Sequence, residues 1–308
     1  MREERLPESW GLEGPLHRGL HEVWRAYQRV RGDGVAPFHA AARVSAGVDR
    51  LGLAFTVGYS AALERLIPDS VLPCALCVTE DAGNHPRAIK TRLTQSSDGT
   101  HYTLDGTKSF VTFGNLATTL IVAARLGERP DGRPEIVVVR IPANREGVSL
   151  EDAPPIPIVP EVPHARVSFD GVVVHPNERM RGDGYANYVK AFRTVEDIHV
   201  FGAATAYLLG LASRSGAPAD WKAELYSLLA TLERLGSAPA LDPSTHIALH
   251  GAARTLDRLL DCDAATEVWT EAPADESYRW ERDRKLFRVA QKARDARFQK
   301  AASHLGLC

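Results

Sequence analysis

The stretch "ALCVTEDAGNH" (Ala75–His85) begins as an apolar β-strand and then breaks at Thr79 into acids, Gly, Asn and His, with no helix signal. Further along, "DGTKSFVTFGN" (Asp105–Asn115) begins with an Asp-Gly turn signal and continues as an aromatic and β-branched run that ends at Thr112. Each strand is expected to end on a threonine. The two strand ends are therefore predicted to form two edges of one site.

The sequence around these stretches divides into three regions. Residues 1–71 show the apolar spacing of amphipathic or buried helices, at 15–30 and 48–67. Residues 72–178 contain short β-rich runs separated by turn signals such as Ser-Asp-Gly, Asp-Gly and Pro-Asp-Gly, which predict an antiparallel barrel or sandwich. Residues 179–308 are expected to be helical, with helices near 185–213, 220–235, from 242, and 278–302, which would make a four-helix bundle. The predicted fold class is α+β.

Composition and charge exclude several classes of protein. The chain has 308 residues, is 44% hydrophobic and 25% charged, and carries a formal net charge of −2, which gives no general attraction to nucleic acid or anionic membranes. Its first residues lack the apolar core of a signal peptide, and no apolar run approaches the roughly 20 residues that span a bilayer. We expect a cytoplasmic protein with no membrane span and no nucleic-acid partner.

Cys74 and Cys77 form a C-x-x-C pair inside "VLPCALCV", which has the pattern of a strand. This spacing sends two side chains of a strand to opposite faces, and no second C-x-x-C is present to complete a zinc site. We interpret both as buried apolar residues, with redox chemistry as the less favoured alternative.

Together these motifs resemble the acyl-CoA dehydrogenase family. The middle domain of that family carries C-x-x-T-E-P-G-x-G-S-D and later N-G-x-K-x-W-I-T, and "CALCVTEDAGNHPRAIKT" and "DGTKSFVT" stand here in the same order. The family's closing strand is echoed by "VSFDGVVVHPNERMRGDGYANYV". The likeness covers about residues 72–184. It implies N-terminal helices, a middle β-domain and a C-terminal four-helix bundle.

The resemblance also implies FAD as the cofactor. By its motifs, Thr79 and Thr112 would hydrogen-bond the edge of the isoalloxazine ring, and Leu76 with Phe110, Val111 and Thr112 would line its surface. Such donors would stabilise the negative charge that a flavin gains on reduction. The alternative is that the threonines are simply β-forming residues at strand ends.

Two departures concern the substrate and the catalytic base. Asn84 lies where the family has a Gly-Ser-Asp that meets the substrate, and its amide could still hydrogen-bond a carbonyl. The family removes the α-proton of an acyl thioester with a glutamate, often in a Tyr-Glu-Gly sequence that is missing here. Other members carry this base on the first helix of the bundle, where this chain has Glu196 on one face with His199 and several small residues. We predict Glu196 as the base; a carboxylate paired with Arg193 or another cation is the alternative. Three further glutamates lie near the family's usual position without its motif: Glu267, Glu271 and Glu276.

The implied function is an FAD-dependent oxidoreductase of fatty acid metabolism that acts on an acyl-CoA-type substrate. The resemblance further implies an electron-transfer flavoprotein as partner and a homodimer or homotetramer. The family's R-x-x-F-G and Gly-Gly-x-Gly motifs, which hold the dinucleotide end of FAD, are not preserved. A catalytically degenerate homologue that serves as a binding or assembly protein is therefore the alternative.

Two other interpretations are less favoured. Glu196-x-x-His199 is half of a di-iron motif without its second half, although His246 and His250 could add ligands. The last predicted helix has an excess of Lys and Arg that could approach CoA phosphates or a nucleic-acid backbone. A solvated helix face with i,i+4 ion pairs is the commoner explanation.

Overall fold

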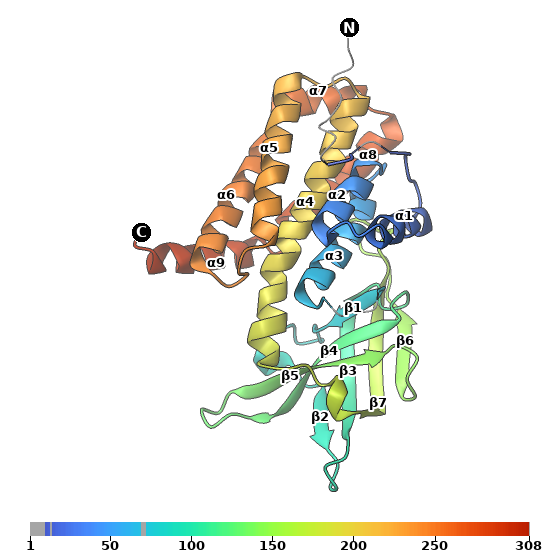
Figure 1. The fold of residues 1–308 in the computed structure, drawn as a ribbon, viewed down its shortest axis with the longest axis vertical. Helices are drawn as coiled ribbons and strands as arrows, with labels where there is room; N and C mark the ends of the chain where they lie inside the picture. Colours follow the sequence, from blue (N-terminus) through green and yellow to red (C-terminus); the bar gives the residue numbers. More distant parts are fainter. Residues whose placement is uncertain (1–9, 13, 69–71, 308) are drawn as a thin grey trace. The chain divides into compact units, whose positions relative to one another are not determined.

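The structure is a computed structural model that describes residues 10–12, 14–68 and 72–307. Most of the N-terminal segment that was compared with a signal peptide lies outside these residues. The chain divides into two compact units (Figure 1). The helical unit comprises Met1–Arg65, Pro157–Glu161 and Thr194–Cys308, and the sheet unit comprises Leu66–Ile156 and Val162–Arg193.

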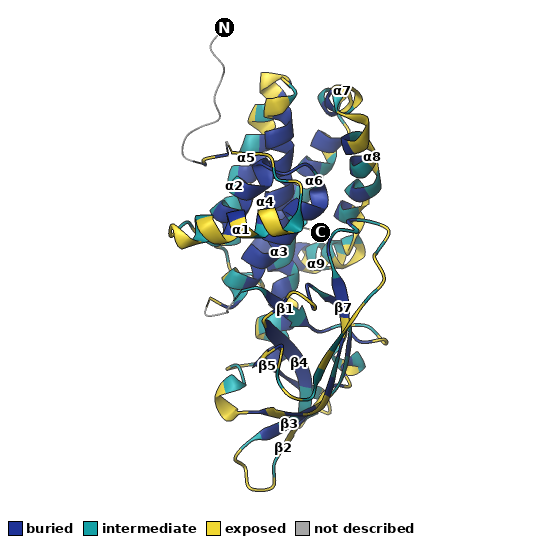
Figure 2. Cartoon of the chain, turned by 90° about the vertical axis from the view of Figure 1, so that its right-hand side faces the viewer, coloured by how far each residue is buried: buried dark blue, intermediate teal, exposed yellow. Residues whose placement is uncertain are grey.

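The N-terminal segment contains three helices: α1 (Leu20–Gly32), α2 (Pro37–Ala46) and α3 (Leu51–Leu66). The helices predicted at 15–30 and 48–67 are both present, but α1 begins at Leu20, later than predicted, and α2 was not predicted. It is short and alanine-rich, and begins with Pro37 in its first turn, a position that suits proline. Both α2 and α3 are buried along most of their length (Figure 2). Their stability therefore comes from packing more than from an amphipathic pattern.

The C-terminal segment has more helices than the four that were predicted: α4 (Ala191–Arg214), α5 (Ala219–Gly236), α6 (Pro243–Leu260), α7 (Asp263–Glu271), α8 (Ala274–Asp283) and α9 (Gln291–His304). The prediction of one continuous helix over 278–302 is wrong. A 3-10 turn, η4 (Arg284–Arg288), follows α8, and Ala290 has a left-handed backbone with φ 58°. Arg294 holds this break by donating hydrogen bonds to the carbonyl oxygens of Phe287 and Val289.

The sheet unit has seven strands: β1 (Cys74–Cys77), β2 (Arg92–Gln95), β3 (Tyr102–Thr112), β4 (Thr119–Glu128), β5 (Pro134–Pro142), β6 (Val148–Asp152) and β7 (His164–Val174). Their order is β1-β4-β2-β3-β7-β6, with β5 paired to β4. Most neighbours are antiparallel, as predicted, but β1 and β2 both run parallel to β4. Short turns η1 (Pro86–Ala88) and η2 (Pro176–Glu178) follow β1 and β7, and a π-helix, η3 (Gly184–Lys190), packs on β4 and β5.

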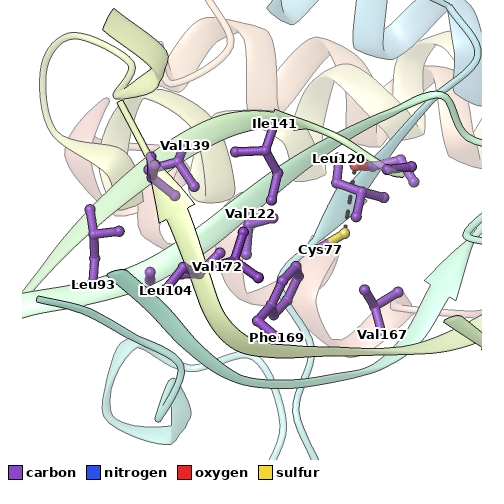
Figure 3. Close-up of a cluster of buried hydrophobic side chains, with 14 of the residues drawn as sticks. Cys77, Leu93, Leu104, Leu120, Val122, Val139, Ile141, Val167, Phe169 and Val172 are labelled. Atoms are coloured by element: carbon purple, nitrogen blue, oxygen red, sulfur yellow. Dashed lines mark hydrogen bonds between the residues drawn. The ribbon is translucent and has the colours of Figure 1, made fainter. Parts of the chain in front are cut away.

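Apolar side chains cover both faces of β1. Ala75 and Cys77 join a large cluster that includes Leu104, Val122 and Phe169 (Figure 3). Leu76 and Val78 point the other way, into a second cluster. Burial raises the pKa of the Cys77 thiol to about 12. The thiol thus stays protonated at neutral pH, and Cys74 is also buried, which agrees with the interpretation of both as apolar residues.

The Asp-Gly signal at Asp105 does not mark a turn. Asp105 and Gly106 lie inside β3, where the pairing with β7 shifts register, so the predicted turn is wrong. Gly106 has φ 141°, and a Cβ there would lie 2.6 Å from the Cα of Thr91. A β-bulge needs this backbone freedom as much as a turn does, and the local sequence does not distinguish them.

No helix of the described residues is long and apolar enough to cross a bilayer.

Candidate functional site

The two motif segments meet in the sheet unit. The backbone N–H of Ser109, near the end of β3, donates a hydrogen bond of 2.8 Å to the carbonyl oxygen of Thr79, just after β1. This bond extends the sheet beyond β1. It brings the Thr79 segment beside the residues that lead to Thr112.

Both predicted threonines are half-buried. Thr112 is the direct cross-strand partner of His164 on β7. Within the part of the chain that the structure describes, neither the Thr79 nor the Thr112 hydroxyl hydrogen-bonds another protein group. Each can therefore donate to, or accept from, a bound molecule.

A second irregularity of β3 turns Phe110 outward. The register with β7 shifts between Lys108 and Val111, and Phe110 has φ 62°, a left-handed conformation that is unusual for a large side chain. Phe110 is 54% exposed, and the centroid of its ring lies 5.0 Å from that of His164. Strained backbone of this kind tends to occur at ligand sites, where the surrounding structure enforces it.

The other predicted cofactor and substrate residues differ in accessibility. Val111 is 1% exposed and points into the large cluster, so its side chain is not available to a ligand. Leu76 is half-buried against the second cluster. Asn84 is exposed in the turn that follows the Thr79 segment.

A buried ion pair, missed by the sequence analysis, fixes the two motif segments. Lys108 Nζ lies 2.7 Å from Glu80 Oε1 and 3.3 Å from the carbonyl oxygen of Val78. The Lys108 side chain is fully buried. The carboxylate of Glu80 also accepts hydrogen bonds from the backbone N–H groups of Lys90 (2.7 Å) and Thr91 (3.0 Å).

The electrostatics of this pair favour an ionised Glu80. Burial raises the pKa of the carboxyl, but the hydrogen bond from Lys108 and those from the two N–H groups outweigh it and lower the pKa overall. Glu80 directly follows Thr79, and Lys108 lies two residues before Phe110. The signal that could have found this pair is that one of the two motifs contains a lysine, Lys108, and the other a glutamate, Glu80.

A polar cluster lies on the surface beside the same strand ends. Asp81 accepts hydrogen bonds from the Ser109 hydroxyl and from Arg166 on β7, the latter at 3.1 and 3.3 Å. The Arg166 guanidinium, followed by the Ser109 hydroxyl, lowers the pKa of Asp81. Asp81 replaces the proline of the Thr-Glu-Pro motif. The site in this chain is thus more polar than the motif implies.

The predicted base, Glu196, lies half-buried on α4 in the helical unit. The small residues on its face have a packing role. A Cβ at Gly210 would lie 1.9 Å from the carbonyl oxygen of Ala46 on α2, and one at Gly58 on α3 would lie 3.0 Å from Ala203. This column is therefore filled by neighbouring helices and does not itself indicate a ligand beside Glu196.

The other ionisable candidates of the helical unit have different surroundings. His199 is buried, with Nδ1 2.8 Å from the Val195 carbonyl oxygen. Glu276 on α8 is 9% exposed and 3.9 Å from Arg214, and burial raises its pKa. Glu267 and Glu271 are exposed. Among the residues that the structure describes, no three His, Cys, Asp or Glu side chains group in a way that could hold a metal ion.

The sheet unit matches a known family model. Residues 75–172 match the model described as acyl-CoA dehydrogenase, middle domain. These residues form an acyl-CoA dehydrogenase middle domain. The resemblance inferred from the two motifs is thereby confirmed. No curated protein matches the sequence.

Solved structures extend the likeness of this middle domain to the whole chain. FkbI, described as acting in biosynthesis of the methoxymalonyl extender unit of the Fk520 polyketide, has a TM-score of 0.67 at 19% identity, covering 97% of this chain and 96% of its own. Butyryl-CoA dehydrogenase from Megasphaera elsdenii has a TM-score of 0.66 at 15% identity (96% and 88%). PigA in complex with FAD has a TM-score of 0.62 at 14% identity (97% and 88%). The predicted α+β fold is confirmed.

Proposed function

We propose that this protein is an FAD-dependent oxidoreductase of the acyl-CoA dehydrogenase type. The observation that carries the proposal is the pair of threonine hydroxyls of Thr79, just after β1, and Thr112, at the end of β3, which make no hydrogen bond to another group of the described chain. FAD is the cofactor named for one structural neighbour, PigA. The middle-domain match adds independent support.

The residues of the site fit a flavin ring. Hydroxyl groups suit the ring's polar edge, and the exposed aromatic ring of Phe110 offers an apolar surface beside them. The ion pair between Glu80 and Lys108 holds both segments in place without itself being exposed. When bound, FAD would supply the acceptor for the hydride that the substrate loses from its β-carbon.

For the substrate we propose an acyl thioester of the CoA type, with Asn84 available to its carbonyl oxygen. Glu196 is the proposed base: its carboxylate takes the α-proton, and the C–H electron pair forms the new double bond as the hydride leaves the β-carbon. An electron-transfer flavoprotein is the proposed partner that reoxidises the flavin. A homodimer or homotetramer is the proposed assembly, to be measured as mass in solution.

A flavin-binding assay tests the cofactor site. Purified protein incubated with FAD should become yellow after removal of free FAD, and Thr79→Val and Thr112→Val should each weaken FAD binding about tenfold, since each removes one hydrogen bond. Thr100→Val, at an exposed hydroxyl near the β2–β3 turn, is the matched control. Colourless protein that takes up no FAD would instead favour the non-catalytic homologue, as the missing dinucleotide motifs do.

A second experiment tests the base. Glu196→Gln should lower turnover of acyl-CoA substrates by roughly 100-fold or more while FAD absorbance is unchanged. Glu276→Gln provides the comparison, because Glu276 is the buried carboxyl with a raised pKa near the family's usual position. Full activity of the Glu196 variant together with loss in the Glu276 variant would reject the assignment.

A further inference from the structure

His164 is a buried histidine beside the candidate flavin site, and the proposed function gives it no role. It is the first residue of β7 and is 8% exposed. Its Nδ1 is buried and has no hydrogen-bond partner among the described residues. A buried nitrogen without a partner is costly, so its presence calls for an explanation. His164 also lies outside the three motifs on which the family resemblance rests, so the resemblance does not explain it.

The strand register places the His164 side chain on the same face of the sheet as Thr112. The two residues are direct cross-strand partners, and the next pair along the ladder is Val111 with Ala165. Val111 and Ala165 both belong to the large apolar cluster. Because successive side chains of a strand alternate between faces, Thr112 and His164 both point to the opposite face, away from that cluster.

Thr112 and His164 form the closely spaced kind of cross-strand pair. The N–H of Phe113 donates a hydrogen bond of 2.9 Å to the carbonyl oxygen of Pro163, so the hydrogen-bonded pair is the neighbouring one. The carbonyl oxygen of His164 accepts from the N–H of Ala153, on the other side of β7, at 2.9 Å. In an antiparallel ladder, side chains approach most closely in the non-hydrogen-bonded pairs. Rotation about χ1 can therefore bring the Thr112 hydroxyl to the imidazole.

The imidazole of His164 is held against Phe110 in its neutral form. The two rings are 5.0 Å apart between centroids and tilted by 44°. Burial lowers the pKa of the imidazole, and the carbonyl group of Val162 raises it by a smaller amount. At neutral pH the ring is therefore uncharged, and its free nitrogen can form a hydrogen bond with a hydroxyl group.

The charged side chains on the strands next to His164 have partners of their own. Arg166, two residues along β7, pairs with Asp81 at 3.1 Å and lies opposite Glu151 of β6. The carboxylate of Asp152, at the end of β6, accepts a hydrogen bond of 2.7 Å from Asn115. The unpaired Nδ1 of His164 is thus left for a neutral partner.

We propose that His164 is a positioning residue of the flavin site, whose Nδ1 forms a hydrogen bond with the Thr112 hydroxyl when the flavin is bound. A hydroxyl group has one hydrogen to donate and two lone pairs, so it can bond the imidazole and the flavin edge together. The imidazole would fix the direction in which Thr112 presents its remaining hydrogen-bonding capacity. This inference rests on the proposed function, which places Thr112 at the flavin.

FAD titration of the full chain, followed by flavin fluorescence, tests the role of the nitrogen. His164→Phe keeps an aromatic ring but removes Nδ1, and should weaken FAD binding about fivefold to tenfold. His164→Asn keeps a polar group close to the position of Nδ1, and should bind FAD within about threefold of the unchanged protein. His175→Phe, at an exposed position just after β7, is the matched control and should have no effect.

The outcomes separate this inference from the proposed function. FAD affinity that is unchanged in His164→Phe, or that falls equally in the Phe and Asn variants, would overturn the role of Nδ1 while leaving the flavin site in place. If the unchanged protein takes up no FAD, both the inference and the proposed function fail. Circular dichroism of each variant establishes that it is folded before it is titrated.

A double-variant cycle tests whether His164 acts through Thr112. Thr112→Val already removes the hydroxyl that His164 is proposed to orient, so adding His164→Phe to it should weaken FAD binding no further. If the two losses multiply instead, the residues act independently and the inference is wrong. A merely structural role of His164 would give such independent losses.

The pH dependence of FAD binding gives a further test. Because His164 is buried, its protonated form is disfavoured in the arrangement that binds FAD, and affinity should fall as pH is lowered below about 6. The fall should approach about tenfold per pH unit once the pH is below the pKa of His164 in the free protein. His164→Asn should remove this component, and an identical pH profile in that variant would overturn the inference.

Discussion

Lys108 Nζ and Glu80 Oε1 lie 2.7 Å apart, and this ion pair joins the segment after β1 to the end of β3 from the buried side of the sheet. The same two segments present Thr79 and Phe110 at the candidate flavin site. A change that breaks this ion pair should therefore affect both the stability of the sheet unit and the geometry of the candidate flavin site.

Lys108→Met should destabilise the protein by roughly 3 kcal/mol, because it leaves the Glu80 carboxylate buried without its cation. Urea unfolding measures the change, and FAD affinity should fall with it. The double variant Glu80→Gln with Lys108→Met should recover part of the stability. Arg166→Gln, which breaks the exposed pair with Asp81, should have a much smaller effect; an equal loss in both single variants would contradict the role assigned to burial.

Phe110→Gly and Phe110→Ala should differ in stability by about 1 kcal/mol, with Gly the more stable, because Gly adopts a backbone φ of 62° without a steric penalty. Both variants should lose FAD affinity to a similar extent, since both lack the aromatic ring. Thermal unfolding and flavin titration measure the two effects separately. If Ala proved as stable as Gly, the backbone at this position would not be strained.

Gly210→Ala should destabilise the helical unit by about 1–3 kcal/mol, because the new Cβ would lie 1.9 Å from the Ala46 carbonyl oxygen and force α2 and α4 apart. Gly251→Ala on α6 is the control: a Cβ there meets nothing within 4 Å, and the change should stabilise the protein by about 0.5–1 kcal/mol. In chemical unfolding, the free energy of unfolding should fall for the Gly210 variant and rise for the Gly251 variant. A change in the same direction in both variants would argue against close packing of α2 and α4.

Stability should fall by about 3 kcal/mol as pH drops from about 6.5 to about 4, owing to His199. Burial lowers the pKa of this histidine to about 4, with the nearby Arg65 adding a smaller effect in the same direction. In this window the unfolded chain binds a proton that the folded chain does not, so acid favours unfolding. His199→Asn should flatten this part of the pH profile, and an unchanged profile in that variant would contradict the role assigned to His199.

Sequence patterns correctly predicted the elements in which apolar residues recur at a regular spacing. The apolar spacing predicted the helices α1 and α3, and the motifs around Thr79 and Thr112 gave the family resemblance. Here the local pattern and the tertiary packing agree, so the local pattern is sufficient.

The errors arose where distant contacts decide the local structure. Gly106 suits a turn or a bulge equally, and only its pairing with β7 and contact with Thr91 select the bulge. The last helix breaks because Phe287 is buried and Arg294 caps the freed carbonyl groups. Lys108 was overlooked as a core residue because its burial depends on Glu80, which lies far away in the sequence.

The division of the helical unit between distant parts of the chain has a consequence for biosynthesis. Its first helices leave the ribosome well before α4, whose Ala203 and Gly210 are needed to cover Gly58 and Ala46. The sheet unit draws on a nearly continuous stretch and can acquire its native contacts earlier. The apolar surfaces of α2 and α3 that α4 covers must therefore stay uncovered until α4 has been synthesised.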